Sequence, residues 1–374
     1  MRKPKKMKTM RKTMFIVCML WIVGLTSCHD EDITPIDTSN GTGKQIKEVV
    51  FLEKWYFKGN SEVYTRSSAA RMNFTWKNDT LIKIQKIAGI YPFSDAYGDS
   101  YTLDFEYVGD TIVCKWNGLG YVVARAVKED GRIVSVSSVM KDYSDIETCM
   151  ALGYWYNYQY HYDRNGLILS MDWDCPNCNL TTYTYTWDNG NLKNSHWEYI
   201  YEGQSIQNLY RYYTHDNMHT PWECMKDIVL MMNPILPPSK NNITGCISIH
   251  EDLGIDTVSD TNNSFYYTYQ NNYAASLNNI TRSPNQVLQK KWYYAYTDGT
   301  ANNLPRIVNI TADANRFSYV GYKAHGSGSY EYGDTVILNA YKPEFLQWSD
   351  GDTSNPRIVV AREDATYTAI YRDL

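Results

Sequence analysis

The fold of this chain is constrained most by a short unit that recurs along its length. In each unit an alternating aromatic segment leads through Asn, Asp or Gly into a second alternating segment, as Tyr183, Tyr185 and Trp187 do before Asn189-Gly190. Asn-Gly and Asp-Gly between such segments are strong hairpin signals, because the type I′ turn needs two positive φ angles. Units of this kind occur at 74–84, 105–115, 158–171, 183–192, 266–269 and 292–299. Their irregular spacing predicts a meander of unequal hairpins.

The aromatic content agrees with this pattern and indicates the fold class. The chain has 34 Tyr and 11 Trp among many Thr, Val and Ile residues, which suit the half-buried faces of a sheet. We therefore predict an all-β protein whose residues 47–304 form a large, curved, antiparallel hairpin meander, barrel-like or half-barrel. The capping box Thr220-Pro221-Trp222-Glu223 predicts one helix near 221–232. We expect this helix to cover the open side or end of the sheet.

Alternation places Tyr183, Tyr185 and Trp187 on one face of their strand and threonines on the other. These three rings are candidate ligand-contacting residues, because an aromatic face can stack against sugar rings. They are also what a sheet uses for its own core. We favour the core interpretation, since nearly every hairpin repeats the pattern and a binding platform would not need so many rings.

The N-terminus indicates where the mature protein lies. Basic residues precede the uncharged segment Phe15–Leu25, and Leu25-Thr26-Ser27-Cys28 resembles a bacterial lipobox. The resemblance implies that residues 1–27 are a signal peptide and that Cys28 is the lipidation site; the alternative is an ordinary secretory peptide cut near Ser27. Acyl chains would anchor the protein in a membrane. The polar segment 28–46 reads as a flexible tether.

The residues after Cys28 extend this prediction. His29-Asp30-Glu31-Asp32 resembles the surface-export signal of Bacteroidetes lipoproteins, which implies an outer-membrane, surface-exposed location. Loss of residues 1–27 removes seven basic residues and no acidic ones, so the formal net charge changes from −5 to −12. A chain this acidic is a poor partner for nucleic acid or anionic lipid headgroups. The expected partners are the membrane, through the lipid, and a glycan or protein ligand.

Residues 47–304 resemble a Bacteroidetes lipoprotein family of unknown function with a porin-like fold. The resemblance rests on the aromatic hairpins, the helix end at Asn233-Pro234, the segment 239–244, and the tyrosine-aspartate pattern of 160–168. It implies a strongly curved antiparallel sheet and brings no activity. Thr and Asn on both faces of the hairpins argue against a sheet embedded in lipid.

The last segment, residues 305–374, is similar to a divergent internalin-type B repeat. The similarity is carried by 328–340, 345–351 and 364–371, in which Trp348 supplies a large ring for the core. It implies a small β-grasp-like module that acts as a spacer or adhesion unit. With two folded units, we expect a boundary near residue 304.

Three sets of residues are candidates for chemistry. A disulfide between Cys175 and Cys178, or free thiols, suits a hairpin turn better than a redox site, which needs a helix start. The other sets are the possible metal ligands His215, Asp216, His219 and Cys224, and the possible glycosidase acids Asp172, Asp174 and Glu198. The two histidines precede the predicted helix and so do not share one rigid face, and we expect no metal site and no cofactor.

We found no catalytic motif in the sequence. The function predicted from the sequence is therefore non-enzymatic binding or adhesion by an outer-membrane lipoprotein. The alternative is a glycan-binding or glycan-hydrolysing protein that uses the aromatic face and nearby carboxylates.

Overall fold

The computed structural model describes most of the chain after residue 43, and all structural statements concern this part. The described residues are 44–58, 63–88, 100–117, 121–139, 155–174, 181–201, 204–252, 255–283, 285–315, 324–341 and 344–372.

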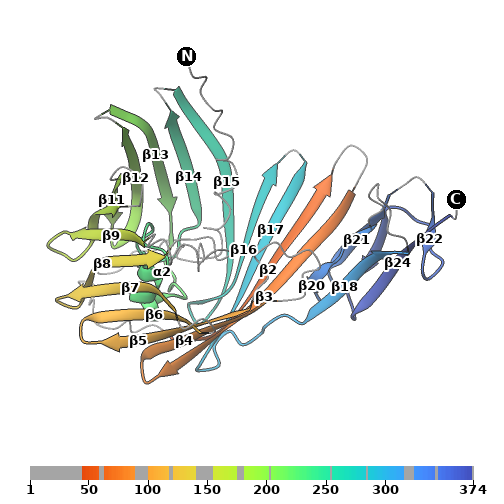
Figure 1. Ribbon diagram of the computed structural model, residues 1–374, viewed down its shortest axis with the longest axis horizontal. Helices are drawn as coiled ribbons and strands as arrows, with labels where there is room; N and C mark the ends of the chain where they lie inside the picture. The colour runs from red at the N-terminus through yellow and green to blue at the C-terminus, as the bar shows by residue number, and fades with distance from the viewer. Residues whose placement is uncertain are drawn as a thin grey trace, which may run out of the picture.

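A nearly closed sheet of 16 antiparallel strands forms the body of the molecule (Figure 1). Each strand pairs with the next along the chain, and the last strand pairs with the first from Gln286 opposite Phe57 to Tyr296 opposite Ile46. The strands are β2 (Ile46–Lys58), β3 (Val63–Lys77), β4 (Thr80–Ala88), β5 (Tyr101–Val108), β6 (Thr111–Asn117), β7 (Tyr121–Glu129), β8 (Arg132–Val139), β9 (Trp155–Tyr162), β10 (Ile168–Asp174), β11 (Thr181–Asp188), β12 (Asn191–Tyr201), β13 (Gln204–Thr214), β14 (Gly245–Asp252), β15 (Ile255–Gln270), β16 (Tyr273–Ser283) and β17 (Gln286–Tyr296). The all-β, barrel-like prediction is confirmed.

The tight turns gather at one end of the sheet, which we call the turn end. There β3 meets β4 at Asn78, β7 meets β8 at Asp130-Gly131, and β11 meets β12 at Asn189-Gly190. These residues have positive φ, from +48° to +78°, which Asn, Asp and Gly tolerate best. The hairpin signals read from the sequence therefore mark real turns. We call the opposite end of the strands the far end.

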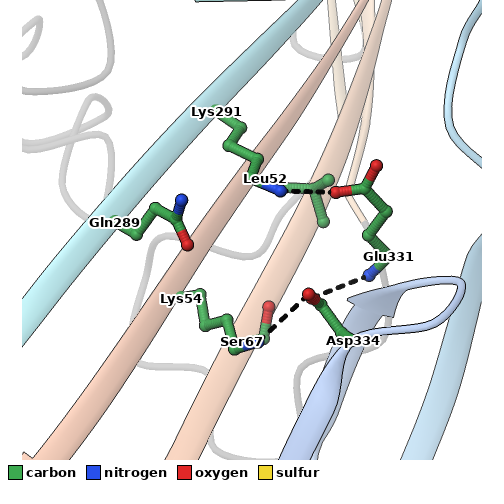
Figure 2. A pocket seen from close by; sticks show the side chains of 7 residues that line it. All are labelled: Leu52, Lys54, Ser67, Gln289, Lys291, Glu331 and Asp334. Atoms are coloured by element: carbon green, nitrogen blue, oxygen red, sulfur yellow. Dashed lines mark hydrogen bonds and ion pairs between the residues drawn. The ribbon is translucent and has the colours of Figure 1, made fainter. Parts of the chain in front are cut away.

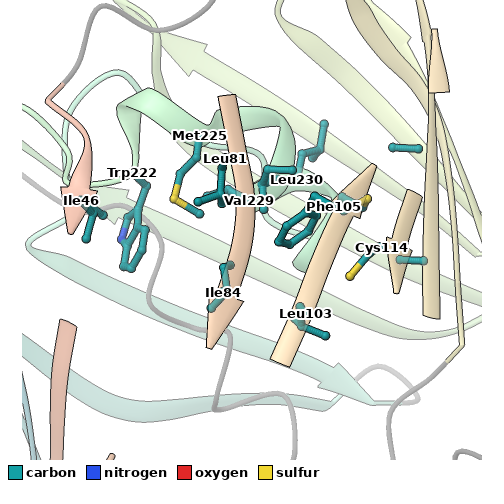
Figure 3. Packing of buried hydrophobic residues seen from close by; sticks show 14 of the residues in the cluster. Ile46, Leu81, Ile84, Leu103, Phe105, Cys114, Trp222, Met225, Val229 and Leu230 are labelled. Carbon is teal, nitrogen blue, oxygen red and sulfur yellow. The ribbon is translucent and has the colours of Figure 1, made fainter. Parts of the chain in front are cut away.

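Apolar and aromatic side chains point into the ring of strands. Tyr183 and Tyr185 are buried, whereas Thr184 and Thr186 between and beyond them are exposed on the outer face. The buried cluster includes Leu81, Leu103 and Phe105, which Figure 3 shows with side chains from the helical segment. The core thus lies inside the ring.

Residues 215–244, which we call the plug, fill the turn end from inside. The plug contains the 3₁₀ turn η2 (Glu223–Met225) and the helix α2 (Lys226–Met232), which packs against β7 and β8. Tyr160 and Tyr185 donate hydrogen bonds to the carbonyls of Pro234 and Ile235, at 3.1 and 2.7 Å. The sheet therefore holds the plug by tyrosine hydroxyls as well as by apolar contact.

The predicted helix near 221–232 is present at the turn end but begins later as an α-helix. Its first turn is 3₁₀, closed by the amide of Met225 donating to the Trp222 carbonyl at 3.0 Å. Four consecutive residues, Ile228–Met231, are buried, so the helix is enclosed rather than laid on a surface. The stability of this short helix therefore comes from tertiary packing on more than one side. Within the described residues, no helix is long and apolar enough to cross a membrane.

The described part of residues 305–374 is made of short strands with a core of its own. The strands are β18 (Ile307–Ala314), β19 (Ala324–His325), β20 (Gly328–Glu331), β21 (Thr335–Ala340), β22 (Phe345–Trp348), β23 (Arg357–Val360) and β24 (Ala365–Tyr371). Val336, Leu338 and Trp348 are fully buried in this second cluster. We call this unit the C-terminal module; in Figure 1 it lies beside β3, in blue.

Candidate functional site

The predicted ligand-contacting rings Tyr183, Tyr185 and Trp187 lie on the inner face of β11. Tyr183 and Tyr185 are 7% and 4% exposed, and Trp187 donates from Nε1 to the Ile168 carbonyl at 2.7 Å. Burial raises the pKa of Tyr183 to about 12, because ionisation would place a charge in an apolar interior. These rings belong to the core near the plug, and a ligand from solvent meets other residues first.

A second set of inward-facing rings lies closer to the far end. We call Tyr156, Trp173, Trp197 and Tyr199 the aromatic wall; all four are half-buried. The ring centroids of Tyr156 and Trp173 are 6.1 Å apart, and those of Trp197 and Tyr199 are 6.3 Å apart. Because the rings point into a ring of strands and still keep exposed area, solvent reaches the inner face at this level.

The two tryptophans of the wall have unused polar atoms. Nε1 of Trp173 and Nε1 of Trp197 are buried and have no hydrogen-bond partner among the described residues. An indole N–H is a donor only, and burying it without a partner costs free energy. The aromatic wall therefore combines ring faces with two unsatisfied donors, which is the chemistry of a site for a ring-bearing, hydrogen-bonding ligand.

Arg211 lies where this wall meets the plug. Its register partners are Ser195 on β12 and Ser248 on β14, and Ser195 pairs in turn with Tyr185. Burial raises the pKa of Tyr213 to about 12, and the Arg211 charge and its hydrogen bond to Tyr213 partly offset that rise. The guanidinium is thus on the inner face, half-buried among neutral groups.

The candidate glycosidase acids Asp172, Asp174 and Glu198 lie instead on the outer face. Asp172 accepts hydrogen bonds from the Thr182 hydroxyl at 2.8 Å and pairs with His161 at 2.9 Å. Glu198 is two strands away, since Thr182 lies opposite both residues. Two strand spacings are about 9.6 Å, and the outer face of a curved sheet makes side chains diverge. These carboxylates are therefore not brought together around a bond to be cleaved.

The structure also separates the possible metal ligands. Nδ1 of His219 lies 2.9 Å from Oε2 of Glu223, and the ring centroids of His219 and Tyr273 are 4.7 Å apart. Asp216 instead accepts a hydrogen bond from the Met218 amide at 2.8 Å. Burial lowers the pKa of His215 to about 4, so this imidazole is neutral near neutral pH. Within the described ranges, no three His, Cys, Asp or Glu side chains lie close enough together to hold a metal ion.

The cysteines in the described ranges form no disulfide with one another. Cys114, Cys224 and Cys246 are free thiols, and burial raises the pKa of Cys224 to about 11, which keeps it in the unreactive thiol form. Cys28, Cys175 and Cys178 lie outside the described residues. Their lipidation and disulfide roles stay predictions.

The C-terminal module packs on the outer face of β2, β3 and β17 and leaves a small, shallow cleft there, lined by Leu52, Ser67 and Gln289 among others (Figure 2). Lys291 pairs with Glu331 at 2.6 Å and Lys54 with Asp334 at 3.1 Å. Gly328 lies against the Ser67 backbone, where an added Cβ would come within 2.2 Å of the Ser67 carbonyl oxygen. The cleft is lined by these ion pairs and belongs to the junction between module and sheet.

Three comparisons with known proteins were informative only for solved structures. No protein-family model and no curated protein matches the chain. A porin-like protein from Bacteroides uniformis is similar to this chain, with 13% sequence identity and a TM-score of 0.45. The match covers 68% of this chain and 99% of that protein. A porin-like protein from Bacteroides vulgatus is 11% identical with a TM-score of 0.40, over 68% and 99%.

A third solved structure is more distant. It is a putative outer membrane lipoprotein-sorting protein domain from Vibrio parahaemolyticus, 12% identical with a TM-score of 0.17, over 66% of this chain and 85% of its own. These TM-scores are low, so function is argued from the residues of this chain alone.

The candidate site residues that sequence reasoning missed are Trp173, Trp197 and Arg211. Alternation in their strands places each of them on the face that carries the core rings, and this signal was available in the sequence. The distance of these residues from the plug could not be predicted from the sequence, because it depends on how far the plug extends inside the ring of strands.

Proposed function

We propose that this chain is a lipid-anchored protein of the outer membrane with a non-enzymatic binding role, and that its ligand site is the aromatic wall. The observation that carries the proposal is the half-exposure of Trp173 and Trp197 inside a ring whose turn end is filled. Aromatic faces bind the apolar faces of sugar rings, and unsatisfied donors fix orientation. A glycan is the ligand class that uses both.

The charged side chains on the outer face support the same assignment, because a sheet that faces lipid has the opposite arrangement. It carries ion pairs such as Lys83–Asp104 and Lys115–Glu106, and exposed Thr184. A sheet that faces lipid presents an apolar band outward and a polar interior. Here the apolar side chains face inward, so the lipid at Cys28 would supply the membrane attachment and the sheet would serve as the ligand scaffold.

The test is glycan binding by variants of the aromatic wall. Mature protein, purified in detergent, is applied to a glycan array as wild type, Trp173→Ala, Trp197→Ala and the control Trp155→Ala. Trp155 is also half-buried on β9 but lies on the outer face, beneath Arg125. We expect the two wall variants to lose retention by about tenfold or more and the control to keep it, as for loss of a buried stacking ring.

Two results would contradict the proposal. If no glycan on the array retains the wild-type protein, a glycan is not the ligand class. If Trp155→Ala loses as much binding as Trp197→Ala, the site lies on the outer face. Thermal melting of each variant separates lost binding from lost folding.

A further inference from the structure

Arg211 is a cation in the interior of a strongly acidic protein. The formal net charge of the whole chain is −5, and it becomes −12 once residues 1–27 are removed. The neighbours that share its register on the inner face are Ser195 and Ser248, which are neutral. The side chain is half-buried, and a guanidinium in a protein carries its positive charge at neutral pH.

The position of Arg211 matters as much as its charge. It is level with Tyr185, whose hydroxyl donates to the plug at Ile235, so Arg211 lies at the floor of the aromatic wall. Trp197 and Tyr199 continue from this floor toward the far end along β12. A ligand that enters from the far end meets the rings first and the guanidinium last.

The rings and the guanidinium select a ligand with two parts. The rings of Trp197 and Tyr199 are inclined by only 17° to each other with their centroids 6.3 Å apart, so the two rings are nearly parallel on the inner face. The guanidinium presents N–H groups in a planar fork that matches the two oxygens of a carboxylate. Nε1 of Trp197, buried without a described partner, adds a donor beside them.

We infer that the inner face binds a ring-bearing carboxylate, with its ring against Trp197 and its carboxylate on Arg211. This inference rests on the proposed function and adds the charge of the ligand to it. Two sources offer the chemistry, an acidic sugar such as a uronic acid and a simple aromatic acid. A sugar has several rings to place along the wall, whereas an aromatic acid has one.

The experiment measures three probes by titration calorimetry on the mature protein in detergent. Trigalacturonate represents the acidic sugar, galactotriose is its neutral counterpart, and 4-hydroxybenzoate represents the aromatic acid. We expect an acidic probe to bind at least about tenfold more tightly than galactotriose, since hydrogen bonds between charged groups are roughly twice as strong as neutral ones and a carboxylate accepts two of them from the guanidinium fork. Which acidic probe binds identifies the source.

Variants assign the preference to Arg211. Arg211→Gln should weaken binding of the acidic probe much more than binding of galactotriose and so remove the preference, and Arg211→Lys, which keeps the charge without the fork, should retain part of it. The matched control is Arg125→Gln, because Arg125 is an exposed arginine on the outer face of β7. Weaker binding of acidic probes at higher salt should accompany the effect in wild type.

The outcomes separate this inference from the proposed function. If acidic and neutral probes bind equally and Arg211→Gln changes neither, the charge assignment is overturned while the aromatic wall stands. If Arg125→Gln abolishes the preference, the cation is elsewhere and the assignment is likewise overturned. If neither the array glycans nor any probe binds wild type, both the wall and the assignment fail. Arg211→Lys covers the case in which Arg211→Gln does not fold.

Discussion

Tyr185 provides the most direct test of how the sheet holds the plug. Its side chain is 4% exposed, its ring lies 6.5 Å from that of Tyr183, and its hydroxyl donates to the Ile235 carbonyl at 2.7 Å. Tyr185→Phe removes only the hydroxyl and leaves that carbonyl unpaired, which should cost about 1–3 kcal/mol in the free energy of unfolding. Tyr185→Ala also removes the buried ring, for a total of roughly 3–5 kcal/mol.

The assay is urea unfolding followed by tryptophan fluorescence, with the slope of the transition compared between variants. The matched control is Tyr266→Ala, because Tyr266 is 59% exposed and should change stability by no more than about 0.5 kcal/mol. The reasoning is refuted if Tyr185→Ala unfolds at the same urea concentration as wild type. It is also refuted if Tyr185→Phe costs as much as Tyr185→Ala, since the ring would then contribute nothing.

Three further predictions follow from the residues described. Cys28→Ala should move the mature chain from the membrane fraction to the soluble fraction, and full membrane retention on fractionation would contradict the lipid anchor. Residues 305–374 expressed alone should unfold in one thermal transition, because the module has its own core around Trp348; a fragment without dispersed amide resonances would argue against this. The free energy of unfolding should fall as the pH rises from about 10 to about 12. Burial raises the pKa of Tyr183 in the folded protein to about 12, whereas a tyrosine in the unfolded chain ionises near pH 10. The contribution of this tyrosine is therefore complete below about pH 10 and is lost as the pH rises toward about 12. The loss should reach about 2–3 kcal/mol for such a tyrosine at pH 12. If the tyrosinate absorbance that is missing in Tyr183→Phe develops near pH 10 in the folded wild type, the burial of Tyr183 is contradicted.

The hairpin pattern predicted the sheet well because each hairpin is a local structure. Asn189-Gly190 makes a turn wherever it lies between alternating segments, and the turn sets the register of β11 on β12. Alternation likewise predicted that Tyr183 and Tyr185 share a face with the core. The helix boundary was less accurate, since the turn around Glu223 adopts 3₁₀ geometry while α2 begins at Lys226.

What the sequence by itself determined is the strand order, the turns and the inward or outward direction of each side chain. Closure of the ring was decided only by the tertiary structure, because pairing of β17 with β2 joins residues far apart in the chain and depends on the summed twist and curvature of all intervening strands. The same holds for the proposed binding site. Alternation predicts that Tyr185 and Trp197 both point to the inner face. The plug reaches the level of Tyr185 and buries it, whereas Trp197 lies nearer the far end and stays half-buried, so packing between distant segments decided which ring became core.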